Sequence, residues 1–398
     1  MARLVGGSGD CAAVTIPTML TMPVIGHVNK YWGRDRGGVE AVLHASVQDL
    51  SRRGYGVEVL ACRPWRSPAR PFPPGVAGRE LAAPVVASMP VHWEFGAALA
   101  QIESRCDLLH FHLPFPLAEA ATLRLPKRIP WVATWHAEVL GRSPMVQWAQ
   151  QAVSRRFLQR VDAIVVSAPA SSHSDGLRPF PERVHLIPFG FDWRAFSGPR
   201  PRRDAGHPAQ LIFVGRLVPY KGLDVLLRAM TTLPARLQIV GDGRERSRLQ
   251  RLAARLQVAD RVEFLGHLPD AELPSRLAAA DIFVLPSRTA SEAFGVAQLE
   301  AMAAGLPVVN TALATGTDWV SLDGVTGLTV APDNPVQLAA ALRHLIEDRD
   351  FRLACGRRAR RRARDLFSIE ARGAEMVALY EGLLAPRSKM EVFPLRTS

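Results

Sequence analysis

Two glutamates that follow a short apolar run are the residues of this sequence best suited to hold a polar ligand. Glu292 and Glu300 are eight residues apart in SEAFGVAQLE (291–300), which follows the run IFVLP (282–286). On a helix this spacing is about 12 Å along the axis and about 80° of rotation. The two carboxylates could therefore bind opposite ends of one long ligand. A solvated amphipathic helix with two unrelated glutamates would show the same spacing.

Two cations stand at the end of another expected strand. Arg216 and Lys221 lie in VGRLVPYKG (214–222), after the run LIFVG (211–215). Arginine offers a planar pair of donors and lysine a point charge, and both suit a diphosphate when glycines let the backbone approach. No Gly-Lys-Ser/Thr follows, so this is not a Walker A loop. Spacing alone leaves solvated surface cations as the commoner interpretation.

Two further segments place glycine at the start of an expected helix. Gly37 and Gly38 follow the first strand pattern, and Phe294 and Gly295 open the helix that would carry Glu300. Free backbone N–H groups at a helix N-terminus favour phosphate and other oxygen-rich groups. For Gly37 and Gly38, a plain tight turn is the alternative.

The elements that position these residues alternate between short β-branched runs and segments of helical period, a pattern typical of parallel sheets with crossover helices. The expected strands are 23–28, 55–61, 107–112, 130–135, 162–167 and 183–188, then 211–215, 237–241, 262–266, 282–286, 307–310 and 326–330. In the second half, helices are expected near 222–231, 245–257, 270–280, 295–304 and 335–347. Residues 197–210 are rich in Pro, Gly and Arg, as linkers are. The sequence predicts two α/β domains of parallel sheets that face one another across a ligand-binding cleft.

Composition narrows the class of protein. The chain has 398 residues, and 49 Lys and Arg against 37 Asp and Glu give a net charge of +12. Such a charge attracts anions: nucleotides, nucleic acid or an acidic membrane surface. No stretch reaches the roughly 18 apolar residues of a spanning helix, and residues 1–20 lack the pattern of a signal peptide. We expect a cytoplasmic protein in which residues 1–20 are either a disordered extension or a stretch upstream of the true start.

Taken together, the glutamate segment, the following AMAAGLPVV and the sequence DGVTG (323–327) resemble the family-4 retaining glycosyltransferases of GT-B fold. The resemblance runs from about Val24 to Phe367. It implies that Glu292 holds hydroxyls of the donor sugar, that Phe294 and Gly295 offer backbone amides to it, and that Glu300 binds the nucleotide ribose.

The same resemblance assigns roles to other segments. Arg216 and Lys221 would neutralise the diphosphate leaving group, with Gly37 and Gly38 on its other side. Gly266, His267 and Leu268 would contact the nucleobase, and His136, in TWHAE, would lie near the donor sugar and the reacting centre. The implied domains are a Rossmann-like acceptor-side domain (21–193), a Rossmann-like donor-nucleotide domain (208–370), and a C-terminal helix returning to the first domain plus a tail (371–398).

The expected function is therefore transfer of a hexose from a nucleoside diphosphate sugar to a hydroxyl of a growing, lipid-linked cell-surface glycan. Residues 310–321 resemble mannosyl- and rhamnosyltransferases of lipopolysaccharide O-chains, which favours a GDP-mannose type of donor over a UDP-hexose. We expect no cofactor and no metal, because the one D-x-D (348–350) ends a helical segment. The alternatives are a sugar-nucleotide 2-epimerase and a charge-driven binding protein.

An arginine run gives the charge a specific location. Residues 357–364 hold six arginines in eight positions. The run is either a solvated helix face or a surface that adheres to anionic lipid headgroups on the inner face of the cytoplasmic membrane. No nucleic-acid-binding module accompanies it, so nucleic acid is not an expected partner.

Overall fold

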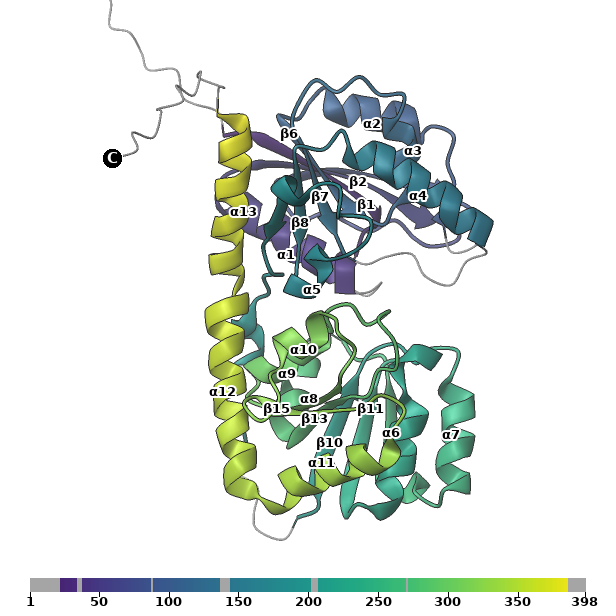
Figure 1. Ribbon diagram of the computed structural model, residues 1–398, viewed down its shortest axis with the longest axis vertical. Coiled ribbons are helices and arrows are strands. Elements are labelled where there is room, and N and C mark those ends of the chain that lie inside the picture. Colours follow the sequence, from purple (N-terminus) through teal and green to yellow (C-terminus); the bar gives the residue numbers. More distant parts are fainter. Residues whose placement is uncertain are drawn as a thin grey trace, which may run out of the picture.

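The computed structural model describes residues 22–33, 38–86, 89–136, 144–201, 207–269 and 271–385. Figure 1 shows two α/β domains, one above the other, with two helices of the C-terminal segment running along one side of both. The N-terminal extension and Gly37 lie outside the described residues.

The N-terminal domain is built on a seven-stranded parallel sheet in the order β3-β2-β1-β6-β7-β8-β9. Its strands are β1 (Val24–Tyr31), β2 (Gly56–Pro64), β3 (Val76–Ala83), β6 (Leu108–Leu113), β7 (Trp131–Trp135), β8 (Ala163–Val166) and β9 (Val184–Leu186), with a small antiparallel pair, β4 (Val85–Val86) and β5 (Met89–Pro90). Its helices are α1 (Gly38–Arg52), α2 (Phe95–Glu103), α3 (Pro116–Thr122), α4 (Pro144–Leu158) and α5 (Pro169–Ser172). The central strands β6 and β7 are buried along their whole length, as expected where helices cover both faces of a parallel sheet.

The C-terminal domain has a six-stranded parallel sheet in the order β12-β11-β10-β13-β14-β15. The strands are β10 (Ala209–Val214), β11 (Ala235–Val240), β12 (Val262–Gly266), β13 (Ile282–Leu285), β14 (Val308–Thr311) and β15 (Gly327–Val330). The helices are α6 (Leu223–Ala229), α7 (Arg246–Arg255), α8 (Leu273–Ala279), α9 (Val296–Ala303), α10 (Gly316–Val320) and α11 (Pro335–Glu347). The strand order reverses between β10 and β13, the kind of point where open α/β sheets bind ligands.

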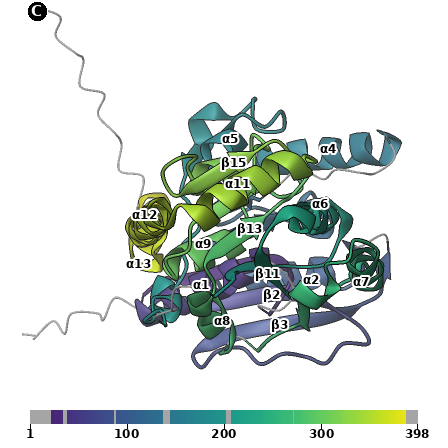
Figure 2. The ribbon, with the colours of Figure 1, turned by 90° about the horizontal axis from the view of Figure 1, so that it is seen from below.

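Two consecutive helices connect the domains. α12 (Arg349–Phe367) contacts α9 of the C-terminal domain, and α13 (Ile369–Leu384) contacts α1 of the N-terminal domain. Between them the chain pairs with Phe191, whose N–H donates to Phe367 O and whose carbonyl accepts from Ile369 N, both at 3.0 Å. Seen from below, both helices stand nearly end-on beside the sheets (Figure 2).

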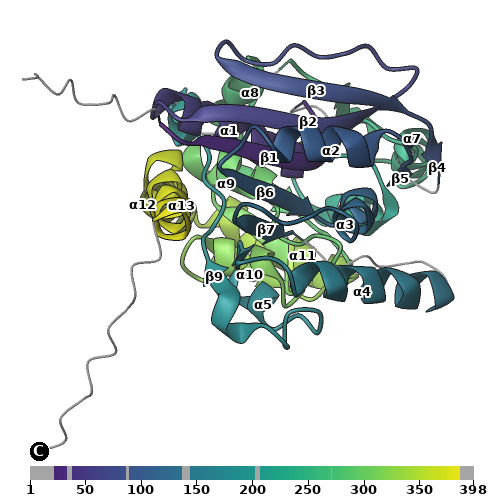
Figure 3. The ribbon, with the colours of Figure 1, turned by 90° about the horizontal axis from the view of Figure 1, so that it is seen from above.

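The expected fold of two parallel-sheet domains is confirmed, and besides the short pair β4 and β5 one strand, β3, was not indicated by the sequence pattern. β3 is the outermost strand beside β2 (Figure 3). Its sequence, VAGRELAA, carries a glycine and two charged residues in place of a β-branched run, and its first half is largely exposed. An edge strand packs on fewer neighbours, so its sequence needs less apolar patterning.

Candidate active site

Glycines end three neighbouring strands of the C-terminal sheet and bring their backbones close together. Gly215 N donates to Val240 O at 3.0 Å, and Gly241 N donates to Gly266 O at 2.7 Å. Gly241 has φ +120°, and a Cβ there would stand 2.1 Å from the carbonyl oxygen of Gly215. The ends of β10, β11 and β12 therefore form a row of side-chain-free backbone, on which a flat or anionic group could lie.

Lys221 and Glu292 form a buried ion pair beside this row. Lys221 Nζ donates to Glu292 Oε2 at 2.5 Å, and the two side chains are only 10% and 9% exposed. Ser287 Oγ, just past the end of β13, donates to the same carboxylate oxygen at 2.8 Å. The carboxylate is thus fixed by a cation and a hydroxyl, and the ammonium keeps two further N–H donors for a ligand.

Gly222 allows Lys221 to take this position. Lys221 ends a 3₁₀ turn (Pro219–Lys221), and Gly222 turns the chain into α6 with φ +66°. A Cβ on Gly222 would lie 1.9 Å from Pro286 O, the carbonyl that precedes Ser287. The lysine turn and the end of β13 therefore touch backbone to backbone, and only glycine fits between them.

We expect Gly222→Ala to separate Lys221 from Glu292 and to remove most of the activity. The left-handed backbone alone costs about 1 to 3 kcal/mol, and the clash with Pro286 adds to it. Gly324→Ala is the matched control, because Gly324 has φ +67° and nothing within 4 Å of its added Cβ. Thermal unfolding and donor turnover should therefore be far worse for Gly222→Ala, and equal effects would contradict this role of the Gly222 contact.

A buried polar network holds the loop that carries Glu292. Thr315 Oγ1 donates to Glu292 O at 2.9 Å, and Gln298 Nε2 donates to Phe294 O at 2.8 Å. Asn310 Nδ2, on β14, donates to Thr317 O at 3.1 Å. The loop between β13 and α9 is therefore tied to both α9 and α10, which keeps the Glu292 carboxylate in place without substrate.

Phe294 and Gly295 lead into α9, and Glu300 lies further along it. Gly295 is the N-cap residue, with φ +71°, and Phe294 is buried. Glu300 is half-buried and lines a hollow of about 90 Å³ together with Val296, residues of α1 and the segment 190–196. Two domains thus contribute to the surroundings of Glu300, whereas Glu292 is held within the C-terminal domain.

The other residues expected in the donor site are more exposed. The Arg216 side chain is exposed at the end of β10. Gly266 is the last residue of β12, two strands away from β10, and the exposed His267 and the half-buried Leu268 follow it. Gly38 is the first residue of α1. The sequence therefore brings Lys221 and Glu292 into direct contact, while Arg216 and the 266–268 segment lie along the same sheet edge.

His136 follows β7 and is buried among aromatic rings. Burial lowers its pKa to about 3, so the imidazole is neutral at physiological pH. Its ring centroid is 5.1 Å from that of Phe189, which is 4.8 Å from that of Phe294. Phe189 thus connects the His136 ring of the N-terminal domain to the donor loop of the C-terminal domain.

Two expectations about charge need correction. Lys221 is not a solvated surface cation, because it is buried in the ion pair with Glu292. The arginine run is not one solvated face either. Arg360 donates to Ser197 O, and Arg362 donates to Trp319 O at 2.6 Å and to Val320 O at 3.0 Å. These two guanidiniums cap backbone carbonyls of the linker and of the C-terminal domain, which leaves the exposed Arg357, Arg358, Arg361 and Arg364 of the run facing solvent.

The groups that position the site are not apparent from the sequence alone. Ser287, Thr315 and Gln298 hold the Glu292 loop, and Phe189 bridges the domains. Ser287 had a signal, a hydroxyl two residues after a buried strand, but its partner could not be identified without the fold.

Comparison with known proteins agrees with this architecture. The family model described as Glycosyltransferase Family 4 matches residues 36–193, and Glycosyl transferases group 1 matches residues 200–362. The D-rhamnosyltransferase WbpZ of Pseudomonas aeruginosa is 29% identical, over 87% of this chain and 92% of the relative. A GDP-mannose-dependent α-(1-6)-phosphatidylinositol monomannoside mannosyltransferase of Mycolicibacterium smegmatis is 34% identical, over 67% of this chain and 72% of the relative.

A solved structure shows the same fold. Sucrose-phosphate synthase from Thermosynechococcus elongatus superimposes with a TM-score of 0.76 at 23% identity, covering 91% of this chain and 99% of that one. Both domains therefore match known glycosyltransferase domains in sequence, and their arrangement matches a solved two-domain structure. The chain belongs to the group 1 and family 4 glycosyltransferases and has the GT-B fold of two Rossmann-like domains.

Proposed function

We propose that the protein transfers a hexose, with retention of anomeric configuration, from a nucleoside diphosphate sugar to a hydroxyl of a growing, lipid-linked glycan. The observation that carries this proposal is the buried Lys221–Glu292 pair at the edge of a glycine-lined sheet. A GDP-mannose type of donor is favoured, because the relatives include a D-rhamnosyltransferase, an O-antigen chain mannosyltransferase and a GDP-mannose-dependent mannosyltransferase. UDP-hexose is second, because a structural neighbour, HepE from Anabaena, was solved with UDP-glucose.

In this mechanism the protein stabilises the departing diphosphate. Negative charge develops on the phosphate oxygens as the bond to the sugar breaks, and preorganised donors aimed at that charge lower the barrier most. Lys221 is already fixed by Glu292, and Arg216, which precedes it in the same segment, is exposed. Glu292 has a second oxygen, Oε1, for hydroxyls of the sugar. The leaving phosphate would itself accept the proton of the acceptor hydroxyl, so positioning is the main task of the protein.

The two glutamates should behave differently when changed. Glu300→Gln is expected to weaken binding of any free nucleoside diphosphate by about 10-fold, because it removes a charge-assisted hydrogen bond to the ribose. Glu292→Gln keeps an acceptor oxygen for Lys221 Nζ, so it should leave that binding nearly unchanged and lower sugar transfer. Calorimetric titration with GDP and a turnover assay separate the two effects. Reversed phenotypes would mean that the donor binds in the opposite orientation, with its sugar at Glu300 and its ribose at Glu292.

A donor panel tests the proposed substrate. The protein is mixed with GDP-mannose, UDP-glucose, ADP-glucose and dTDP-glucose, and thermal unfolding is measured. A ligand at 100 times its dissociation constant stabilises a protein by about 2.7 kcal/mol, which is easily detected. We expect the largest shift with GDP-mannose. A shift with UDP-glucose alone would show that the donor is a UDP-hexose. No shift with any sugar nucleotide would contradict the proposed function.

Attachment to an anionic membrane is a second part of the proposal. Among the described residues, no helix is both long and apolar enough to cross a bilayer. Arg357, Arg358 and Arg361 are exposed on α12, and each cation near a charged surface adds roughly 1 kcal/mol. We expect sedimentation with phosphatidylglycerol vesicles, release by about 0.5 M salt, and loss when these three become Gln. Unchanged sedimentation of that variant would show that the run is a solvated face.

A further inference from the structure

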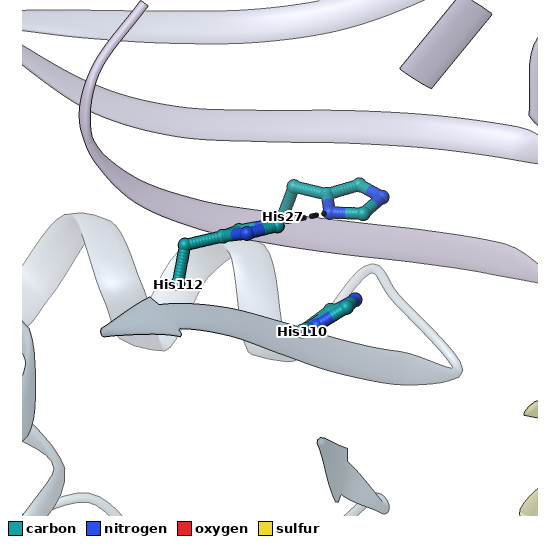
Figure 4. A group of neighbouring side chains, drawn as sticks. All are labelled: His27, His110 and His112. Carbon is teal, nitrogen blue, oxygen red and sulfur yellow. Dashed lines mark hydrogen bonds between the residues drawn. The ribbon is translucent and has the colours of Figure 1, made fainter. Parts of the chain in front are cut away.

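Four buried histidines gather on one face of the N-terminal sheet, and the mechanism above uses none of them, although His136 is expected near the donor sugar. His27 is on β1, His110 and His112 are on β6, and His136 follows β7. His27 and His110 are direct neighbours in the parallel register. Figure 4 shows His27 reaching from β1 toward the two histidines of β6. All four rings are at least 95% buried.

The histidines divide into two separate hydrogen-bonded sets. His27 Nδ1 is 3.1 Å from His112 Nε2, and His112 Nδ1 is 3.2 Å from His136 Nε2. These contacts make a chain of three rings that runs from the middle of the sheet to the active site. His110 is outside this chain, since its Nδ1 meets Tyr380 OH of α13 at 2.5 Å and its Nε2 meets Thr134 Oγ1 at 2.6 Å.

A metal ion is a poorer explanation of this cluster than a hydrogen-bonded chain. One nitrogen each of His27, His110 and His112 lies within 4.8 Å of the others, which is the spacing of a candidate site. The planes of neighbouring rings are inclined by only 20° to 36°, however. Histidine ligands must direct their in-plane lone pairs to one point at about 2.0 Å, and nearly parallel rings do not do so. Both nitrogens of His110 also have hydroxyl partners already.

Because the imidazoles are neutral, the direction of one hydrogen bond in the chain fixes the direction of the next. Burial lowers the pKa of His27 to about 3, and burial also lowers the pKa of His112 well below its usual value. A neutral imidazole has one N–H donor and one bare acceptor nitrogen. If His27 donates to His112, then His112 donates to His136, and His136 carries its proton on Nδ1. If the first hydrogen bond is reversed, the second reverses with it, and the free N–H is then on His27 Nε2.

The ends of the chain decide between the two arrangements. Among the described residues, His27 Nε2 and His136 Nδ1 are buried atoms without a hydrogen-bond partner. A buried N–H without an acceptor is rarer in proteins than a buried acceptor without a donor. His27 is in the interior of the sheet, whereas His136 is at the strand end that faces the donor loop. Either arrangement leaves one end with an N–H and the other with an acceptor nitrogen, and only at His136 can an oxygen of a bound substrate accept from that N–H. The arrangement with the acceptor nitrogen on His27 and the N–H on His136 Nδ1 is therefore favoured.

We infer that His27 and His112 are positioning residues that fix His136 as the tautomer with its proton on Nδ1, ready to donate a hydrogen bond to an oxygen of the bound substrate. The role of His136 toward substrate rests on the proposed function. The coupling of the three tautomers does not, since it follows from the chain of imidazoles alone. No proton leaves the chain in this account, and no charged histidine is formed.

Nitrogen NMR of the full chain, labelled with ¹⁵N at histidine, tests the inference without any assay of activity. In the wild-type protein we expect scalar couplings across both N–H···N contacts and a proton on Nδ1 of His136. In His27→Phe the first donor is lost, so His136 should become a mixture of tautomers although it does not touch residue 27. His27→Gln keeps an N–H donor and should restore the wild-type signals.

Tyr380→Phe is the matched control, because it removes a hydroxyl from the neighbouring His110 set and leaves the chain of three intact. It should not change the His136 signals. The donor-hydrolysis kcat should fall by about 10- to 100-fold in His27→Phe with KM unchanged, and recover in His27→Gln. Absent couplings, a His136 tautomer that ignores His27→Phe, or wild-type signals that change with a chelator would overturn the inference. Intact couplings without donor hydrolysis would overturn the proposed function alone.

Discussion

Lys221→Met is expected to lower turnover by about 100-fold or more. The substitution keeps an unbranched side chain of similar length but removes the charge that faces the diphosphate, and loss of one preorganised charge at a developing anion costs about that much. Arg216→Ala should have a comparable effect on turnover. Arg216 is exposed, so its removal should change the free energy of unfolding by less than about 0.5 kcal/mol.

The variants at Lys221 and Arg216 should differ in their free energy of unfolding, because only Lys221 is part of a buried pair. Removing one partner of such a pair leaves a buried charge and costs about 3 to 5 kcal/mol. Lys221→Met should therefore unfold at a much lower temperature than the wild type. The double variant Lys221→Met with Glu292→Gln should regain much of that stability and none of the activity. A double variant no more stable than Lys221→Met would contradict the ion pair. Near-native activity of both Lys221→Met and Arg216→Ala would contradict the assignment of these two residues to the diphosphate.

The second large effect is a loss of stability in mild acid. Burial lowers the pKa of His27 and His136 to about 3 and holds those of His110 and His112 well below their usual value. In the unfolded chain these histidines titrate near 6.5. Between pH 6.5 and pH 3 the unfolded state therefore binds more protons, so stability falls as the pH falls through this window.

The expected loss of unfolding free energy follows from the number of buried histidines. From pH 7 to pH 5.5 each loses about 1 kcal/mol, so the four together lose about 4 kcal/mol of unfolding free energy. Urea unfolding at the two pH values measures this change. His27→Gln should reduce it by about a quarter, whereas the matched control His267→Gln, at an exposed site, should leave it unchanged. A loss of less than about 1 kcal/mol in the wild type would mean that the cluster is solvated.

Local patterns predict much of the fold, because each central strand is a short apolar run with a helix after it. The glutamate segment and the cations at 216 and 221 stand out only through the family resemblance, because their spacing alone also fits solvated side chains. The Lys221–Glu292 contact is not, because its partners are 71 residues apart and only the pairing of β10 with β13 brings them together. The alternation of residues 110 and 112 places two histidines on one face of a strand, but nothing local shows that His27 joins them from β1.

Hydrolysis of GDP-α-mannose, followed by proton and phosphorus NMR, tests whether the protein is a retaining transferase in which Lys221 stabilises the departing diphosphate. We expect the wild-type protein to release GDP together with mannose that first appears as the α anomer. Lys221→Met should be at least about 100-fold slower, and Arg358→Gln, an exposed change on α12, should match the wild type. Mannose that first appears as the β anomer, an isomerised sugar nucleotide without free GDP, or equal rates for Lys221→Met and wild type would contradict the account.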